Sequence, residues 1–223
     1  MEKLFEYDGN CDNADTNSSY KMDMSKIMSS QLQGQMQFLL EVDKMKNVAR
    51  QTLLFDGTRE ETNAEHSWHF ALAAMTLYEH AGMSGVDLYH VVKMAIVHDL
   101  VEIYAGDVPA FDISANVGKR EREQAAARKL FSHLPKAQAD EYHALWEEFD
   151  NEETDSAIFA AAVDCLLPFL SNHIVDGHSW RKFSVTKDMV LSRMKHVETA
   201  IPALWPFVLE AVRSAIQGGF IVE

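Results

Sequence analysis

One apolar segment of the chain carries a histidine and three carboxylates: His98, Asp99, Glu102 and Asp107. The other residues of this segment are apolar on nearly every face of a helix, which indicates that the helix is buried. An adjacent histidine and aspartate in a core lose several kcal/mol of hydration unless an ionic partner compensates, and a bound divalent cation is the best candidate. Glu102 lies one turn beyond His98 and Asp99 and shares their face of the helix. Gly106 can end the helix and direct Asp107 back toward the site.

Two further side chains complete a predicted metal site. His66 falls in the first turn of a helix that Asn63 can cap, and Asp164 is the charge in the middle of a strongly apolar helix. Pro168 lacks the N–H that would bond the Asp164 carbonyl, so we expect a kink beside that carboxylate. The predicted metal ligands are His66, His98, Asp99 and Asp164.

The mixture of nitrogen and oxygen ligands predicts the kind of metal ion. Neutral imidazole with carboxylate suits a borderline divalent ion better than calcium, which prefers oxygen ligands alone. We predict one divalent ion, drawn from Mn, Co, Fe, Ni, Zn and Mg, because no further matched histidine pair indicates a second. Such a site leaves open positions for water and substrate. That arrangement is typical of hydrolysis, in which the ion acidifies a bound water and polarises the group under attack.

Helices must position these residues, since apolar side chains recur at helical spacing through most of the chain. With only 10 Gly and 5 Pro among 223 residues, the composition favours helix over a turn-rich β fold. We predict an all-α, single-domain helical bundle over residues 25–223, after a flexible acidic extension at 1–24. We expect helices at about 25–48, 64–81, 87–105, 118–133, 135–149 and 155–174, a connector at 49–63, and a last helix from about 186 that Pro202 and Pro206 interrupt.

The charge and the cysteines exclude several classes of function. A net charge of −14 argues against binding to nucleic acid or to anionic lipid, because both need a basic face. The sequence shows no signal-peptide core and no apolar run near the ~18 residues of a membrane span, so we expect no membrane association. Two cysteines, Cys11 and Cys165, make no disulfide framework and indicate a reducing compartment. We therefore expect a cytoplasmic protein.

The order of the candidate ligands resembles that of a known family. A histidine, then His-Asp, then a lone Asp on a further helix is the pattern of the HD-domain metal-dependent phosphohydrolases. The resemblance extends to the branch with bacterial 5′-deoxynucleotidases and their HD-domain-containing relatives, and it covers roughly residues 30–180. The matching motifs are Glu65-His66-Ser67-Trp68, then His98-Asp99-x-x-Glu102-x-x-x-Gly106-Asp107, with Arg50 upstream.

The resemblance implies roles for individual residues. The four predicted ligands would bind the metal, Glu102 would orient or deprotonate the attacking water, and Asp107 would assist on the leaving-group or sugar side. Arg50 would hold the phosphate, because the paired donors of a guanidinium match phosphate oxygens. Arg59 would serve either the phosphate or the entry of the chain into the His66 helix.

These residues also have plainer interpretations. Arg50 could pair with an acid of the connector, Asp107 could cap the loop after Gly106, and Glu102 could orient its neighbours without reacting. Trp68 lies next to the ligand-bearing face of its helix and is a candidate for substrate contact, with a core or interface role as the alternative.

The implied reaction converts a nucleoside 5′-monophosphate and water to a nucleoside and phosphate. A phosphodiesterase or a nucleoside triphosphate or alarmone hydrolase is an alternative, but it would need more positive charge for the extra phosphates. A non-catalytic metal-binding nucleotide sensor is a further alternative, which Glu102 and Asp107 argue against. The resemblance and the apolar segment 202–220 predict a homodimer, with a phosphorylated small molecule as the ligand.

Overall fold

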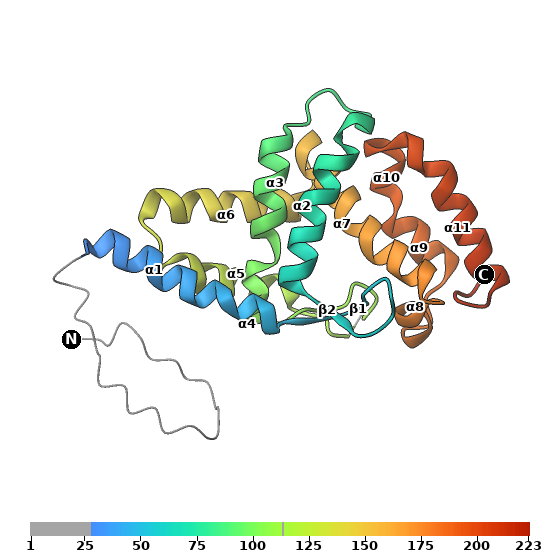
Figure 1. Cartoon of the computed structure of the whole chain (residues 1–223), viewed down its shortest axis with the longest axis horizontal. Coiled ribbons are helices and arrows are strands. Elements are labelled where there is room, and N and C mark those ends of the chain that lie inside the picture. Colours follow the sequence, from blue (N-terminus) through green and yellow to red (C-terminus); the bar gives the residue numbers. More distant parts are fainter. Residues whose placement is uncertain (1–27, 113) are drawn as a thin grey trace, which may run out of the picture.

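The computed structural model describes residues 28–112 and 114–223 of the chain. Within these ranges the protein is mostly helical, with a single sheet of two short strands (Figure 1). This architecture confirms the predicted all-α class. The predicted acidic extension at 1–24 and the start of the first predicted helix lie outside the described residues.

Long helices alternate with short turns along the chain. The N-terminal part contains α1 (Ser30–Val42), the 3-10 helix η2 (Asp43–Asn47), β1 (Ala49–Leu53), β2 (Glu60–Thr62), α2 (Asn63–Leu77) and η3 (Tyr78–His80). The middle part contains α3 (Leu88–Val97), η4 (His98–Val101), α4 (Glu102–Ala105), α5 (Lys119–Phe131), α6 (Lys136–Asn151) and α7 (Asp155–Ile174). The C-terminal part contains α8 (His178–Lys182), α9 (Lys187–Arg193), α10 (Lys195–Ala200), η5 (Pro202–Leu204) and α11 (Trp205–Gln217).

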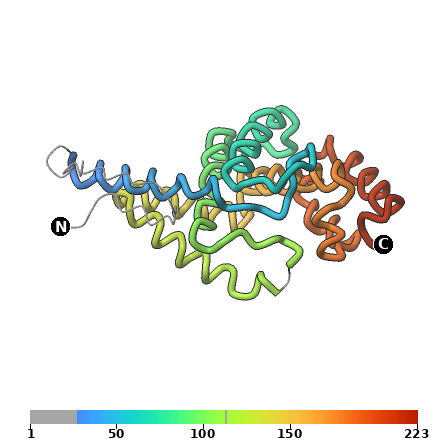
Figure 2. The backbone as a smooth tube through the Cα atoms, turned by 60° about the horizontal axis from the view of Figure 1, so that its bottom comes forward, coloured from blue at the N-terminus to red at the C-terminus, as the bar shows by residue number. Residues whose placement is uncertain are grey.

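Helix α7 lies at the centre of the molecule. It packs against α2, α3, α6 and α10, and most of its residues are buried. Four consecutive small or β-branched residues, Ala160 to Val163, let the neighbouring helices approach closely just before Asp164. Helix α1 runs beside α5 and α6 at one end of the molecule, and α8 to α11 form the other end (Figure 2).

The same helix has the length and composition of a membrane-crossing segment. An 18-residue stretch of α7 has a mean hydropathy of 1.5, but 72% of that stretch is buried inside the protein. The central helix of a packed core meets the same criterion, and the contacts of α7 with four other helices account for its apolar character.

The predicted connector at 49–63 forms an antiparallel hairpin instead of an irregular loop. Strand β1 pairs with β2 so that Ala49 lies opposite Thr62 and Leu53 opposite Glu60. Gly57 in the connecting turn has φ +70°, a conformation that a glycine adopts without strain. The pairing carries Arg50 alongside the start of α2, which the sequence pattern did not indicate.

The start of α2 differs by one residue from the prediction, and the difference affects the site. Thr62, not Asn63, is the N-cap: its hydroxyl accepts from the Glu65 N–H, and the Glu65 carboxylate accepts from the Thr62 N–H, which completes a capping box. Asn63 therefore lies inside the first turn, and its amide is free to bond elsewhere. Asp87 caps α3 and Thr154 caps α7, and the side chain of each accepts hydrogen bonds from the first turn of its helix.

The predicted continuous helix at 87–105 is wrong, because the chain tightens at the His-Asp pair. Helix α3 ends at Val97, His98 to Val101 form the 3-10 helix η4, and α4 begins at Glu102. Residues three apart eclipse one another in a 3-10 helix, which favours placing Asp99 and Glu102 on one side. The predicted interruption of the last helix at Pro202 is confirmed, because η5 begins there, but Pro206 lies inside the first turn of α11 and does not interrupt it. A break between α9 and α10 was not predicted, and α7 continues as one element through Pro168.

Candidate active site

Three predicted ligands come together in the core, each from a different element. One nitrogen each from His66 and His98 and one oxygen from Asp164 all lie within 4.8 Å of one another. His66 Nε2 is 2.8 Å from Asp164 Oδ1, and His98 Nε2 is 3.8 Å from the same oxygen. All three side chains are buried. The site thus forms where three segments meet: the first turn of α2, the start of η4 and the middle of α7.

The tautomer of His98 suits metal binding. Its Nδ1 lies 3.0 Å from the Ala95 carbonyl oxygen, a contact that requires the proton on Nδ1 and leaves a lone pair on Nε2. That Nε2 is buried and has no hydrogen-bond partner among the described residues, although it faces the carboxylates. The imidazole is held in place by Phe149 and Phe70, whose ring centroids are 4.7 and 5.2 Å away. An orphaned buried nitrogen beside imidazole and carboxylate fits a divalent ion.

A buried carboxylate lies behind the predicted ligand His66. Glu61 Oε2 is 3.6 Å from His66 Nδ1, on the side of the ring away from Asp164. Burial and the charge of Arg50 oppose a proton on the imidazole, but the hydrogen bond with Asp164 and the nearby Glu61 carboxylate prevail and raise the pKa of His66. A carboxylate on the outer nitrogen of a ligating histidine is typical of metal centres.

Asp99 lies beside this group and is joined to Arg50. Its Oδ2 is 3.1 Å from His98 Nε2 and accepts a hydrogen bond of 2.6 Å from Arg50 Nη1. Burial alone would raise the pKa of Asp99, but His98 and Arg50 together hold it well below its ordinary value. Metal ligation by Asp99 stays a prediction, and the structure places its carboxylate between Arg50 and His98.

Asn63 connects Arg50 to Glu102. Its side-chain N–H donates to Glu102 Oε2, and its oxygen accepts from Arg50 Nη1 at 3.3 Å. Burial and the nearby charges of Asp99 and Asp107 raise the pKa of Glu102 well above the ordinary glutamate value. Burial likewise raises the pKa of Asp107. Both carboxyl groups are therefore better proton acceptors than exposed ones.

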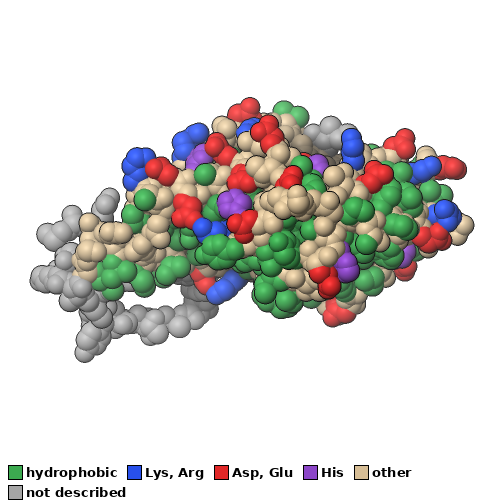
Figure 3. Space-filling view, turned by 90° about the horizontal axis from the view of Figure 1, so that it is seen from above, with side chains coloured by type: hydrophobic (Ala, Val, Ile, Leu, Met, Phe, Trp, Pro, Cys, Tyr) green, Lys and Arg blue, Asp and Glu red, His purple; other side chains and the backbone are tan. Residues whose placement is uncertain are grey.

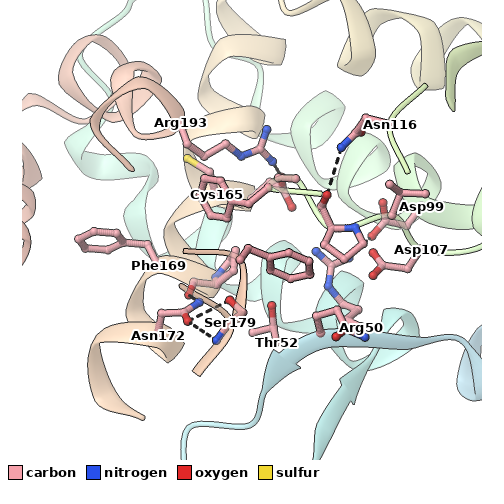
Figure 4. Close-up of a pocket in the computed structure, with 18 of the residues that line it drawn as sticks. Arg50, Thr52, Asp99, Asp107, Asn116, Cys165, Phe169, Asn172, Ser179 and Arg193 are labelled. Atoms are coloured by element: carbon pink, nitrogen blue, oxygen red, sulfur yellow. Dashed lines mark hydrogen bonds and ion pairs between the residues drawn. The ribbon is translucent and has the colours of Figure 1, made fainter. Parts of the chain in front are cut away.

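The cluster opens into a cavity of about 310 Å³, which is within the size range of small-molecule sites. Six carboxylates line it: those of Asp99, Glu102, Asp107, Asp150, Glu152 and Asp164. Three cations also line it: Arg50, Lys119 and Arg193. Five aromatic residues also line the cavity: Phe111, Phe149, Phe169, Trp180 and Phe183. Figure 4 shows Arg50, Asp99 and Asp107 side by side, with Arg193 across the cavity from them.

Arg59 and Trp68 are not brought to this cavity. The Arg59 guanidinium donates to both carboxylate oxygens of Glu65, at 2.8 and 2.5 Å, which lowers the pKa of Glu65 to about 2. Arg59 therefore supports the entry of the chain into α2, the second role considered for it. Trp68 is 65% exposed and lies with Arg59 in a separate surface depression. The geometry gives neither residue the predicted contact with substrate.

Three residues of the site escaped the sequence analysis: Glu61, Asn63 in its bridging role, and Arg193. The pattern Thr62-x-x-Glu65 is typical of a capping box. It could have indicated that Thr62 is the cap and that the Asn63 side chain is available for another role. No comparable local signal marks Arg193, because its partner Asp164 lies 29 positions away. Glu61 was missed because it lies on β2, a strand of the hairpin that the sequence pattern did not indicate.

Comparison with protein families decides the assignment. A family model described as "HD domain" matches residues 42–205, which is more than half of the chain. The chain belongs to the HD-domain family. The matched region contains the four predicted ligands of this HD domain and extends through α9 and α10.

Solved structures agree with this assignment. A predicted metal-dependent phosphohydrolase from Magnetospirillum magnetotacticum is 40% identical, with a TM-score of 0.81, over 87% of this chain and 100% of that one. A conserved hypothetical protein from Pyrococcus furiosus, 21% identical with a TM-score of 0.52, covers 82% of this chain and 99% of that one and shares the fold. The predicted resemblance to metal-dependent HD phosphohydrolases is thus confirmed.

Curated relatives carry a more specific name. The human 5′-deoxynucleotidase HDDC2 is 28% identical over 130 residues, which is 58% of this chain and 62% of that protein. A 5′-deoxynucleotidase from Erwinia tasmaniensis is 27% identical over 140 residues, 60% of this chain and 70% of that protein. The alignment with the human relative thus spans less than two thirds of its length.

Proposed function

We propose that this HD-domain protein is a metal-dependent phosphomonoesterase that hydrolyses nucleoside and deoxynucleoside 5′-monophosphates. The observation that carries the proposal is the buried cluster of His66, His98 and Asp164, beside a cavity that also holds Arg50 and Glu102. The relatives named 5′-deoxynucleotidase support the substrate class.

The reaction joins a water oxygen to phosphorus and breaks the bond between phosphorus and O5′. One proton must leave the water, and one must reach the leaving oxygen. A divalent ion held by the predicted ligands would supply Lewis acidity at the water and at the phosphoryl group. Glu102 would accept the proton from water, and Asp107 would donate one to O5′, since both carboxyl groups have a raised pKa. Arg50 would bind phosphoryl oxygens.

Replacing Glu102 separates a catalyst from a nucleotide sensor. For Glu102→Ala we expect unchanged metal content and unchanged nucleotide binding by calorimetry, with phosphate release reduced by about a hundredfold or more. Glu121→Ala on the exposed face of α5 is the matched control and should behave as the wild type. Equal phosphate release from Glu102→Ala and the control would reject Glu102 as the base. Binding without phosphate release by the wild type would favour a sensor.

We also propose a homodimer in the cytoplasm. Support for the dimer is an apolar stripe on the outer face of α2, where Trp68, Leu72 and Met75 are 65%, 45% and 57% exposed. Phe207 and Leu209 of the 202–220 segment are also exposed, and apolar side chains gather across the face shown in Figure 3. Light scattering at micromolar concentration should give twice the mass of one chain, and a monomeric mass would reject the dimer. The buried, unpaired thiol of Cys165 fits a reducing compartment.

A further inference from the structure

Arg193 is a cation that lines the cavity and takes no part in the proposed reaction. It is the last residue of α9, and its side chain is 45% exposed. Its Nη2 lies 3.3 Å from Asp164 Oδ2. The buried neighbours Val190 and Met194 fix the helix beneath it, so the guanidinium projects from a rigid support into the cavity.

Two arginines therefore bind carboxylates of the cluster, one at Asp99 and the other at Asp164. Arg50 of β1 bonds Asp99 at 2.6 Å, and Arg193 of α9 bonds Asp164 at 3.3 Å. The two side chains approach from opposite sides of the cavity (Figure 4). A group that sits between Asp99 and Asp164 would thus have a guanidinium on each side.

The two arginines differ in how many of their donors are occupied. The Arg50 side chain is only 14% exposed and is engaged by Asp99, by Asn63 at 3.3 Å and by Glu61 at 3.9 Å. Among the described residues, Arg193 has the single hydrogen bond to Asp164. Its remaining N–H groups are available to a ligand in the cavity, and a guanidinium has five such donors in a planar fork.

The negative charge of the site means that an anionic ligand needs hydrogen-bond donors such as these. A phosphate monoester is an anion, whereas six carboxylates line the cavity. Lys119, the third cation, is drawn toward Glu123, whose Oε1 is 3.4 Å from its Nζ. Arg193 is thus the cavity cation with the most unused hydrogen-bonding capacity, and planar paired donors match phosphate oxygens.

We propose that Arg193 is a substrate-binding residue that donates hydrogen bonds to the phosphoryl group from the side opposite Arg50. The inference rests on the proposed function for its ligand, a phosphate monoester, and names a residue that completes the anion site. The competing interpretation is purely structural: Arg193 would only hold Asp164 in position and would never touch a ligand.

Binding of inorganic phosphate to manganese-loaded protein distinguishes the two interpretations. Calorimetry would compare the wild type with Arg193→Gln and Arg193→Lys, and with Arg213→Gln on the exposed face of α11 as the matched control. Manganese content of each sample would be measured in parallel. We expect Arg193→Gln to weaken phosphate binding by about tenfold to a hundredfold, as loss of hydrogen bonds to a charged group does. Arg193→Lys should be intermediate, and manganese content should be equal in all samples.

Equal phosphate affinity in the wild type and Arg193→Gln would overturn the inference, as would absence of phosphate binding by the wild type. Loss of manganese from Arg193→Gln, with unchanged phosphate affinity of the molecules that retain it, would establish the purely structural role instead. The readout does not depend on turnover. If the wild type released no phosphate from any nucleoside monophosphate while Arg193→Gln still weakened phosphate binding, the proposed function would fail and the role of Arg193 would stand.

Discussion

Asn63 donates a hydrogen bond to Glu102, linking the first turn of α2 to the first residue of α4. The same amide accepts from Arg50, so one side chain orients both the proposed base and the proposed phosphate-binding residue. Asn63→Ala would leave both partners without this bond. We expect kcat to fall by about tenfold to a hundredfold with metal content unchanged, because removal of such orienting partners has effects of this size. Asn151→Ala, on the exposed end of α6, is the control, and equal rates in both variants would contradict the orienting role.

Glu61 and Glu60 are adjacent on β2 but differ in burial, which makes them a matched pair. Glu61 is buried with Oε2 3.6 Å from His66 Nδ1, whereas Glu60 is exposed. Glu61→Gln should lower the affinity for manganese by about tenfold to a hundredfold, because His66 loses the charge that fixes its orientation. Glu60→Gln should leave the affinity unchanged. Competition with a chelator of known affinity measures both, and indistinguishable values would remove Glu61 from the metal centre.

The raised pKa of Glu102 predicts a stability effect with a definite sign. A carboxyl whose pKa is higher in the folded state favours folding at pH values below its unfolded pKa and loses that contribution as pH rises through the folded pKa. In metal-free protein at pH 8, Glu102→Gln should therefore raise the melting temperature by about 2–4 °C, which corresponds to about 1 kcal/mol in a chain of this size. At pH 4 the difference should vanish. A lower melting temperature for the variant at pH 8 would show that the carboxylate is not destabilising.

The capping box of α2 should contribute measurably to stability. Thr62→Ala removes the hydroxyl that accepts from Glu65 N–H, at a cost of about 1 kcal/mol. Thr76→Ala, in the same helix but with its hydroxyl bonded only to the Leu72 carbonyl, should change stability by less than about 0.5 kcal/mol. Urea unfolding of the two variants compares them directly, and equal losses would mean that the cap does not hold the start of α2.

The sequence predicted the features that follow from local pattern. His66, His98 and Asp164 were found because ionisable side chains stood out within apolar helical periodicity, and the structure places them within 4.8 Å of one another. The hairpin was not predicted, because β1 and β2 are short and show no alternation of apolar and polar residues. They stabilise each other by pairing with one another.

Residues whose role depends on distant partners could not be found in this way. Arg193 contacts Asp164 across 29 positions, and Asn63 contacts Glu102 across 39. The 3-10 turn at His98 was also missed, because the apolar periodicity continues through it. The turn brings side chains together in the folded site, and local propensity gives no signal for it.

The central claim is that this cluster binds a metal ion and hydrolyses phosphate monoesters of nucleosides. Its most direct test is phosphate release from nucleoside 5′-mono-, di- and triphosphates by metal-stripped protein reloaded with Mn, Co, Fe, Ni, Zn or Mg, beside an Asp99→Ala variant shown to be folded by circular dichroism. We predict release from the 5′-monophosphates alone, only after reloading, and abolished in Asp99→Ala. Release that persists without metal or in Asp99→Ala, or that is confined to the di- and triphosphates, would contradict the account.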